Sequence, residues 1–254
     1  ISAPLGGFLS DQFNWRVALM ALAVFGAVSL TLVALRFEET VRQKNPRALE
    51  PGTLVRTWWG IVRNPTFLAY SALSAASYGG LFTFLASSSF VFIKVLGLSK
   101  TQYGLLMLSM SVVYLFGTVL CRRLLPRLGV RKTVAIAGGL TLLGGTLMGT
   151  LALAGVRGTW AIMLQFYPFM LAHGIHQPCG QSGAVGPFPQ AAGAASALNG
   201  FLMMLVAFVM GGWLGRHMDG SVFPLTNGLW FWSAIIALSA WTLVQKHGDP
   251  TRAA

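Results

Sequence analysis

Two histidines lie close to glutamines in a segment that has no Lys, Arg, Asp or Glu. His173, His176 and Gln177 are spaced i, i+3 and i+4, which places them on one face of a helix, and Gln165 lies about two turns before His173. Histidine can change its charge near neutral pH, so this face could relay protons or hydrogen-bond a bound molecule. The alternative is structural, with both rings neutral and satisfied by neighbouring helices.

The same segment does not favour a metal site. His173-x-x-His176-x-x-Cys179 winds around a helix, and no carboxylate is nearby to complete a set of ligands. The other cysteine, Cys121, forms no CxxC pair with Cys179, so we interpret both thiols as small buried hydrophobes. We therefore expect no metal and no cofactor.

The element that carries these residues must lie in a membrane. No Lys, Arg, Asp or Glu occurs from Gly158 to Gly215, interrupted only by a turn at 186–190. Charged residues make up 9% of the chain, hydrophobic ones 55%, and the mean hydropathy is +0.66. A soluble domain is about a quarter charged. The composition therefore predicts a polytopic membrane protein.

Charge-free windows of about 20 residues give the predicted spans. Backbone polar groups at membrane depth must be satisfied within each segment, so every span is expected to be a helix and the fold all-α. Seven complete spans are predicted, preceded by 1–9 as the tail of an eighth: 17–35, 65–93, 101–121, 133–156, 158–185, 191–215 and 221–245.

The net charge of +12 does not indicate nucleic-acid binding, because the basic residues occur in short clusters between apolar runs. They concentrate in the alternate loops 36–64 and 122–132 and in the tail 246–252. The side with more basic residues is cytoplasmic by the positive-inside rule, which places the C-terminus in the cytoplasm. The turn at 187–192 falls on the same side without any charge.

The segment 36–64 is the one long connection, and it predicts a boundary between two bundles. Residues 1–35 would end an N-terminal bundle, 36–64 would form a central cytoplasmic loop, and 65–254 would be a six-helix bundle with a short tail. Within the loop, 54–59 suggests a short interfacial helix with tryptophan anchors. The chain starts with Ile1 and no signal peptide, so we expect a piece of a longer protein.

Small and aromatic residues recur at helical spacing. Tyr78 and Phe82 are four residues apart and would suit a flat, lipophilic molecule, although simple packing is the alternative. Small residues that allow helices to approach closely are expected mainly to pack. They are Gly145 with Gly149, Gly211 with Gly215, and the series Ala192, Ser196 and Gly200.

One bundle, a long loop and six further helices together resemble the two six-helix halves of the major facilitator superfamily. Several strings are similar to its Bcr/CflA-type drug:proton antiporters, and they occur in order at fitting distances. They are 3–7 (APLGG) with Trp15-Arg16, 37–40 (FEET), 98–106 (LSKTQYGLL), 127–132 (RLGVRK) and, most specifically, 187–198 (PFPQAAGAASAL). The first departs from the family pattern, because only Leu5 separates Pro4 from the glycine pair.

The resemblance implies a chain that runs from the end of helix five to helix twelve. It implies export of amphipathic drugs across a bacterial inner membrane by proton antiport and alternating access. It also implies that the protein is not an enzyme and that the complete protein works as a monomer. The proton-carrying acid would lie before Ile1, and helices seven and ten would line the cavity. An importer of a small metabolite, or a non-functional half-transporter, are the alternatives. The expected substrate-binding residues are Tyr78, Phe82, Gln165, His173, His176 and Gln177.

Overall fold

The computed structural model describes residue 9 and residues 13–37 and 50–248 of the chain, and this part is helical without any strand. Predictions for residues 1–8, 10–12, 38–49 and 249–254 lie outside the described residues. They include the tail of the eighth span, the 3–7 string and most of the 37–40 string.

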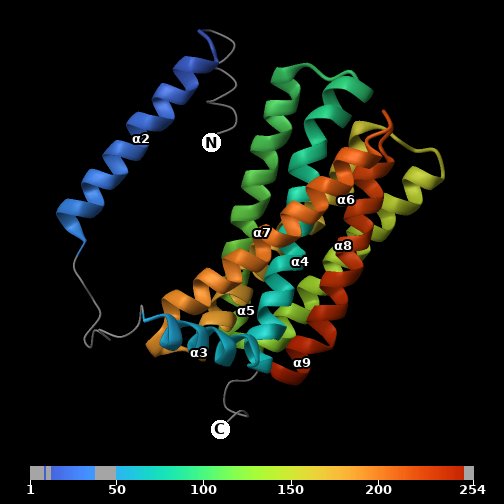
Figure 1. The fold of residues 1–254 in the computed structure, drawn as a ribbon. Helices are drawn as coiled ribbons and strands as arrows, with labels where there is room; N and C mark the ends of the chain where they lie inside the picture. Colours follow the sequence, from blue (N-terminus) through green and yellow to red (C-terminus); the bar gives the residue numbers. More distant parts are fainter. Residues whose placement is uncertain (1–8, 10–12, 38–49, 249–254) are drawn as a thin grey trace.

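Nearly all the helices run lengthwise through the molecule (Figure 1). In chain order they are α2 (Trp15–Arg36), α3 (Pro51–Val62), α4 (Pro65–Ser89) with its π-helical extension η1 (Phe90–Val95), α5 (Lys100–Leu153), α6 (Thr159–Val185), the short 3-10 helix η2 (Pro189–Ala191), α7 (Ala192–His217), α8 (Phe223–Trp241) and α9 (Leu243–His247).

Each of the seven predicted spans is mostly helical, although 221–245 covers both α8 and the start of α9, and 133–156 runs past the end of α5. Five helical segments are long and apolar enough to cross a membrane within the described ranges, and α5, with 54 residues, is one of them. Gly129 breaks α5 at φ 72°, three residues after Pro126, so this segment holds two spans. Helix α6 has 27 residues but is not among the five. We attribute this to the polar side chains that lower its hydropathy.

The connection between the two halves of α5 differs from the prediction. The sequence suggested an open basic loop over 122–132, but the helix continues on both sides of Gly129. Pro126 permits helical geometry in the residues after it, and the glycine alone takes the left-handed conformation that turns the chain. The basic side chains therefore extend from helix ends.

One end of the bundle gathers the segments predicted to be cytoplasmic. The Thr66 hydroxyl donates to the His247 carbonyl (2.9 Å), and the Tyr70 hydroxyl donates to the carbonyl of Gly248 (2.8 Å). Phe188 in the 187–192 turn packs edge-on against Phe67, with ring centroids 6.3 Å apart. The start of α4, the turn and the end of α9 therefore lie together, as the alternation of loops requires.

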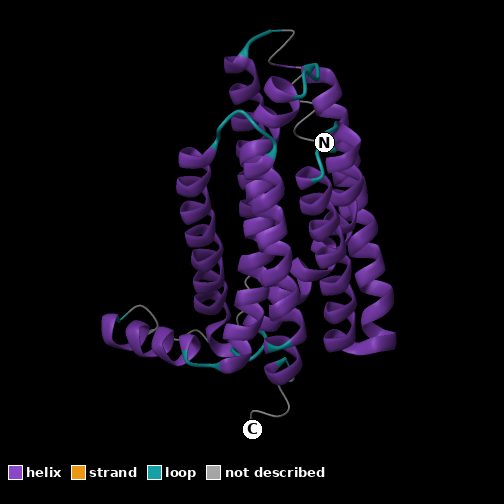
Figure 2. Ribbon diagram, turned by 90° about the vertical axis from the view of Figure 1, so that its right-hand side faces the viewer, coloured by secondary structure: helices purple, strands orange, loops and turns teal. Residues whose placement is uncertain are grey.

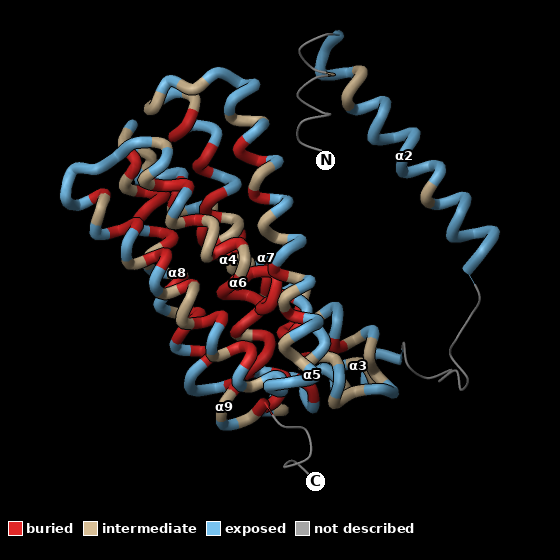
Figure 3. Tube along the Cα trace, turned by 180° about the vertical axis from the view of Figure 1, so that it is seen from behind, coloured by how far each residue is buried: buried red, intermediate tan, exposed pale blue. Residues whose placement is uncertain are grey.

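Helix α3 lies across this same end of the bundle (Figure 2), and it confirms the short helix predicted within the long connection. Its Trp58 and Trp59 are exposed, as anchors at a membrane surface would be. Helix α2 has no buried residue and stands apart from the other helices (Figure 3).

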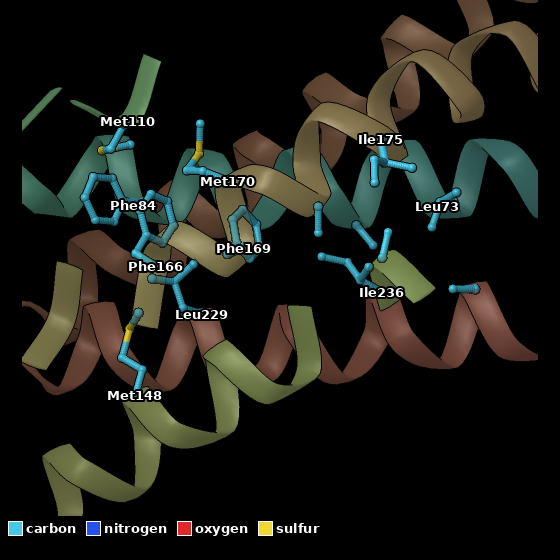
Figure 4. Close-up of a cluster of buried hydrophobic side chains, with 14 of the residues drawn as sticks. Leu73, Phe84, Met110, Met148, Phe166, Phe169, Met170, Ile175, Leu229 and Ile236 are labelled. Carbon is cyan, nitrogen blue, oxygen red and sulfur yellow. The ribbon is translucent and has the colours of Figure 1, made fainter. Parts of the chain in front are cut away.

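The core lies around α4 and α6. Phe84 of α4 stacks on Phe166 of α6 with centroids 3.8 Å apart, and Phe166 stacks on Phe169 at 5.2 Å (Figure 4). These rings are fully or almost fully buried. Aromatic stacking of this kind adds to the burial of apolar area and fixes the depth at which α6 meets α4.

The small residues predicted to allow close helix packing do so on α5 but not throughout α7. A side chain at Gly145 would collide with Ser233, and one at Gly149 with Trp230, so the prediction of close packing is confirmed where α5 meets α8. Gly200 and Gly215 on α7 have open space around them. Their predicted packing role is wrong in this arrangement, whereas Gly211 of the same predicted pair has the ring of Phe82 in α4 at ordinary contact distance.

Candidate functional site

His173 lies in a buried polar position between α6 and α4. Its Nδ1 shares a hydrogen bond of 2.8 Å with the hydroxyl of Ser77, and both residues are buried. The ring is parallel to Phe169, with centroids 6.1 Å apart, and is tilted against Tyr114 at 5.7 Å. Aromatic rings on two sides and one hydroxyl therefore fix the orientation of the imidazole.

Gln177 continues the polar contact between these two helices one turn further along α6. Its Nε2 donates to the main-chain carbonyl of Ser74 (3.3 Å), and its Oε1 accepts from Nε2 of Gln181 (3.3 Å). Gln177 is buried, whereas Gln181 is exposed. Two separate polar contacts thus lie one turn apart between α6 and α4, and the second reaches the surface of α6 at Gln181. We call the residues Ser74, Ser77, His173, Gln177 and Gln181 the polar track.

His176 lies apart from this track, although it is only three residues from His173. It is fully buried, and neither ring nitrogen has a hydrogen-bond partner among the described residues. The main chain of Val134 in α5 lies beside the ring, but the contact does not have hydrogen-bond geometry. A buried polar group without a partner is costly, so an unpaired imidazole here calls for a ligand, a water molecule or a second conformation.

The other three predicted residues occupy different places. Phe82 of α4 lines an open cavity of about 820 Å³ whose other walls come from α7, among them Met204, Phe208 and Trp213. Tyr78 is half-buried on α4, one turn from Phe82. Gln165 is half-buried on α6, and its carbonyl lies against Gly144 of α5. The structure therefore brings His173 and Gln177 together against α4 but does not gather all six side chains around one space.

Three of the track residues, Ser74, Ser77 and Gln181, were not singled out by the sequence. With Ser71 the two serines form a series at intervals of three residues in α4, and all three serines are buried. A repeated serine at helical spacing in a membrane span is the signal that could have found Ser77, since such hydroxyls can bond across helices. Ser74 contacts Gln177 through its main-chain carbonyl, and its hydroxyl donates to the carbonyl of Tyr70 within α4. The partners on α6 could not be named without the packing.

The chemistry available to this site is hydrogen bonding and proton exchange. Among the described residues, no group of three His, Cys, Asp or Glu side chains is placed to hold a metal ion. A second cavity of about 580 Å³ lies between α7 and α8, lined by apolar residues with Asn227 and Trp232. The indole Nε1 of Trp232 is buried without a hydrogen-bond partner.

Comparison with known proteins agrees with this architecture. Residues 1–212 match the model of the Major Facilitator Superfamily. The bicyclomycin resistance protein homolog of Haemophilus influenzae is 25% identical over 83% of this chain and 53% of its own length. Multidrug resistance protein D of Escherichia coli is 29% identical over 82% of this chain and 52% of its own.

A third relative is described only as the uncharacterized MFS-type transporter YdgK of Bacillus subtilis, 24% identical over 96% of this chain and 61% of its own length. The chain spans about half the length of the first curated relatives it matches. The chain belongs to the major facilitator superfamily.

Proposed function

We propose that this chain forms part of a secondary transporter that exports amphipathic drugs across a bacterial inner membrane in exchange for protons. The transporter would alternate between two access states by rocking of its two bundles about a site near the midplane. Two of its relatives bear names that refer to drug resistance, which favours drugs over nutrients as the cargo. On this proposal the protein is not an enzyme and works as a monomer.

The observation that carries the proposal is the polar track between α4 and α6, together with His176, which lies apart from the track on the same helix α6 and has no hydrogen-bond partner. Ionisable side chains in membrane spans are expensive and usually serve a pathway. Here two of them lie on one helix, one held by Ser77 and the other without a hydrogen-bond partner. In this proposal, His176 supplies a hydrogen bond to the substrate or accepts a proton during the change of access.

The cavity at Phe82 supports a lipophilic cargo. Apolar and aromatic side chains make up most of its lining, and Arg216 and His217 lie at one end of α7 within it. Flat, weakly polar molecules are held by aromatic faces with few hydrogen bonds. In this proposal Phe82 and Tyr78 contact the substrate from α4, whereas Gln165, His173, His176 and Gln177 contact it from α6.

The proton-carrying carboxylate is proposed to lie in a segment before Ile1. The six acidic residues of this chain fall in its loops and tails by sequence. Of the two in the described residues, Glu50 precedes α3 and Asp219 lies between α7 and α8. Neither is in a membrane-spanning helix, and we assign a secondary role in proton exchange to His173 and His176, which are both buried in α6.

Drug efflux provides the test. Cells that lack their own efflux pumps would express the chain together with any segment its reading frame places before Ile1. We expect energised cells to extrude ethidium, a flat amphipathic cation, and collapse of the proton gradient by a protonophore to stop the extrusion. His176→Ala is expected to reduce extrusion at least tenfold, whereas Gly200→Ala, in open space on α7, leaves it unchanged.

Two results would overturn parts of this proposal. Extrusion that persists unchanged in the double variant His173→Ala/His176→Ala would remove the α6 site. Proton-independent uptake of a small metabolite, without any ethidium efflux, would favour the importer. Immunodetection of the variants in the membrane fraction separates lost transport from lost protein.

A further inference from the structure

The two cysteines of the chain meet between α5 and α6. Their Sγ atoms are 3.7 Å apart, although the residues are 58 positions apart in sequence, and both side chains are buried, with exposed fractions of 2% and 3%. The sequence interpretation as separate small hydrophobes is correct about burial. It could not show that Cys121 and Cys179 are neighbours, and the proposed transport mechanism makes no use of either thiol.

This contact is not an accident of one flexible side chain, because the first half of α5 and helix α6 run parallel in a fixed register. The hydroxyls of Ser109 and Tyr167 lie 2.9 Å apart at one level, and that pair has the same 58-residue separation as the cysteines three turns later. A constant separation along two helices requires that they run in the same direction. The thiols are therefore held at matching positions.

Close approach of the two backbones reinforces this register. One turn before the cysteines, a side chain at Gly174 would lie 2.7 Å from the Tyr114 carbonyl oxygen and 2.8 Å from the Thr118 nitrogen. A side chain at Gly117 would collide with the carbonyl of Leu171. Only glycines allow this spacing, and it brings the residues one turn further on within reach of each other.

We propose that Cys121 and Cys179 are an oxidisable dithiol, and that an apolar two-electron oxidant closes it to a disulfide that links α5 to α6. The sulfurs must approach from 3.7 Å to the bond length of about 2.05 Å. Such a bond needs closely spaced backbones, which the contacts at Gly117 and Gly174 one turn earlier favour. The bond would fasten the helix that carries His173 and His176 to its neighbour.

The reaction balances with a molecular halogen as the oxidant. One thiol loses its proton and takes an iodine atom from I₂, releasing iodide. The second sulfur then attacks the sulfenyl iodide, the S–S bond forms, and the second iodide and proton leave. Two S–H bonds are thus exchanged for one S–S bond, and I₂ receives two electrons. Iodine is uncharged and partitions into a bilayer, so it can reach thiols that water-soluble reagents reach poorly.

A cleavable chain in native membranes tests the proposal. A protease site inserted in the short connection at 154–158 between α5 and α6 allows the two halves to be separated after treatment with iodine. We expect both free thiols to be lost together and the fragments to stay joined on a non-reducing gel at the size of one chain. Dithiothreitol should separate them, and Cys121→Ser should give separate fragments before and after iodine.

A displaced cysteine provides the matched control. Val119 is exposed on α5, about half a turn from Cys121, so Val119→Cys combined with Cys121→Ala keeps two thiols but points one of them away. This variant should give less than a tenth of the linked product. The proposal is overturned if wild-type fragments separate although both thiols have reacted, if the link joins two chains, or if the displaced pair links equally well. None of these readouts depends on transport activity.

Discussion

The hydroxyl of Ser77 and Nδ1 of His173 lie 2.8 Å apart in the buried contact between α4 and α6. Within the described residues this is the hydrogen bond of the His173 imidazole. The adjacent rings of Phe169 and Tyr114 leave the imidazole little freedom to rotate. The orientation of the histidine therefore depends on a serine almost one hundred residues earlier in the chain.

Ser77→Ala is expected to destabilise the chain by about 1–3 kcal/mol, because it leaves a buried imidazole nitrogen without a partner. Thermal unfolding in detergent, followed by the fluorescence of a thiol-independent dye, measures the change. Ser71→Ala is the matched control on the same helix, since the Ser71 hydroxyl is buried and already unpaired. Equal losses in the two variants would contradict the pairing.

Gly174→Ala should destabilise the contact between α5 and α6, since the added methyl group meets main-chain atoms that cannot move independently of the helix. Overpacking of this kind costs about 1–3 kcal/mol. Gly200→Ala adds the same methyl group to α7 in open space and is expected to change the unfolding temperature little. A stable Gly174→Ala variant would mean that the two helices are further apart.

The C-terminal end of the bundle should depend on Tyr70. Its hydroxyl donates to the carbonyl of Gly248, so Tyr70→Phe removes one buried hydrogen bond, at about 0.5–1.5 kcal/mol. In a chain shortened to end at His247 the acceptor is gone, and Tyr70→Phe should then cause little further loss. Equilibrium unfolding of the four combinations measures this, and full additivity of the two changes would argue against the bond.

Asp219 should stabilise the start of α8 at neutral pH. Its Oδ1 accepts from the Ser221 hydroxyl (2.6 Å) and main-chain nitrogen (3.0 Å), and these bonds hold the pKa of the Asp219 carboxyl below its usual value. A lowered pKa means that the stabilisation is present above the ordinary carboxyl pKa and is lost as the pH falls through the lower, folded value.

Wild type and Asp219→Asn should therefore differ in unfolding temperature at pH 7 and converge in strongly acid solution. The side chain is exposed, so the difference is expected to be small. Unfolding temperatures measured across this pH range provide the check. A difference that grows on acidification would contradict the lowered pKa, because it would mean that folding favours the protonated carboxyl.

The sequence by itself determined that the chain is a bundle of membrane-spanning helices. It also determined which connections lie at the same end of that bundle. Charge-free windows and the one-sided distribution of Lys and Arg are local properties, and the bilayer forces every apolar span to be helical whatever its neighbours are. The spacing of His173 and Gln177 likewise placed both on one helical face, and the structure confirms that both contact α4.

Tertiary structure alone decided which helices these residues meet. Nothing local distinguishes His173, which bonds to Ser77, from His176, which has no hydrogen-bond partner, because the difference is one of neighbouring helices rather than of residue type. The same holds for Cys121 and Cys179, whose contact depends on the parallel register of α5 and α6. Helix packing depends on the surfaces of both contacting helices, and the sequence of one helix describes only one of these surfaces.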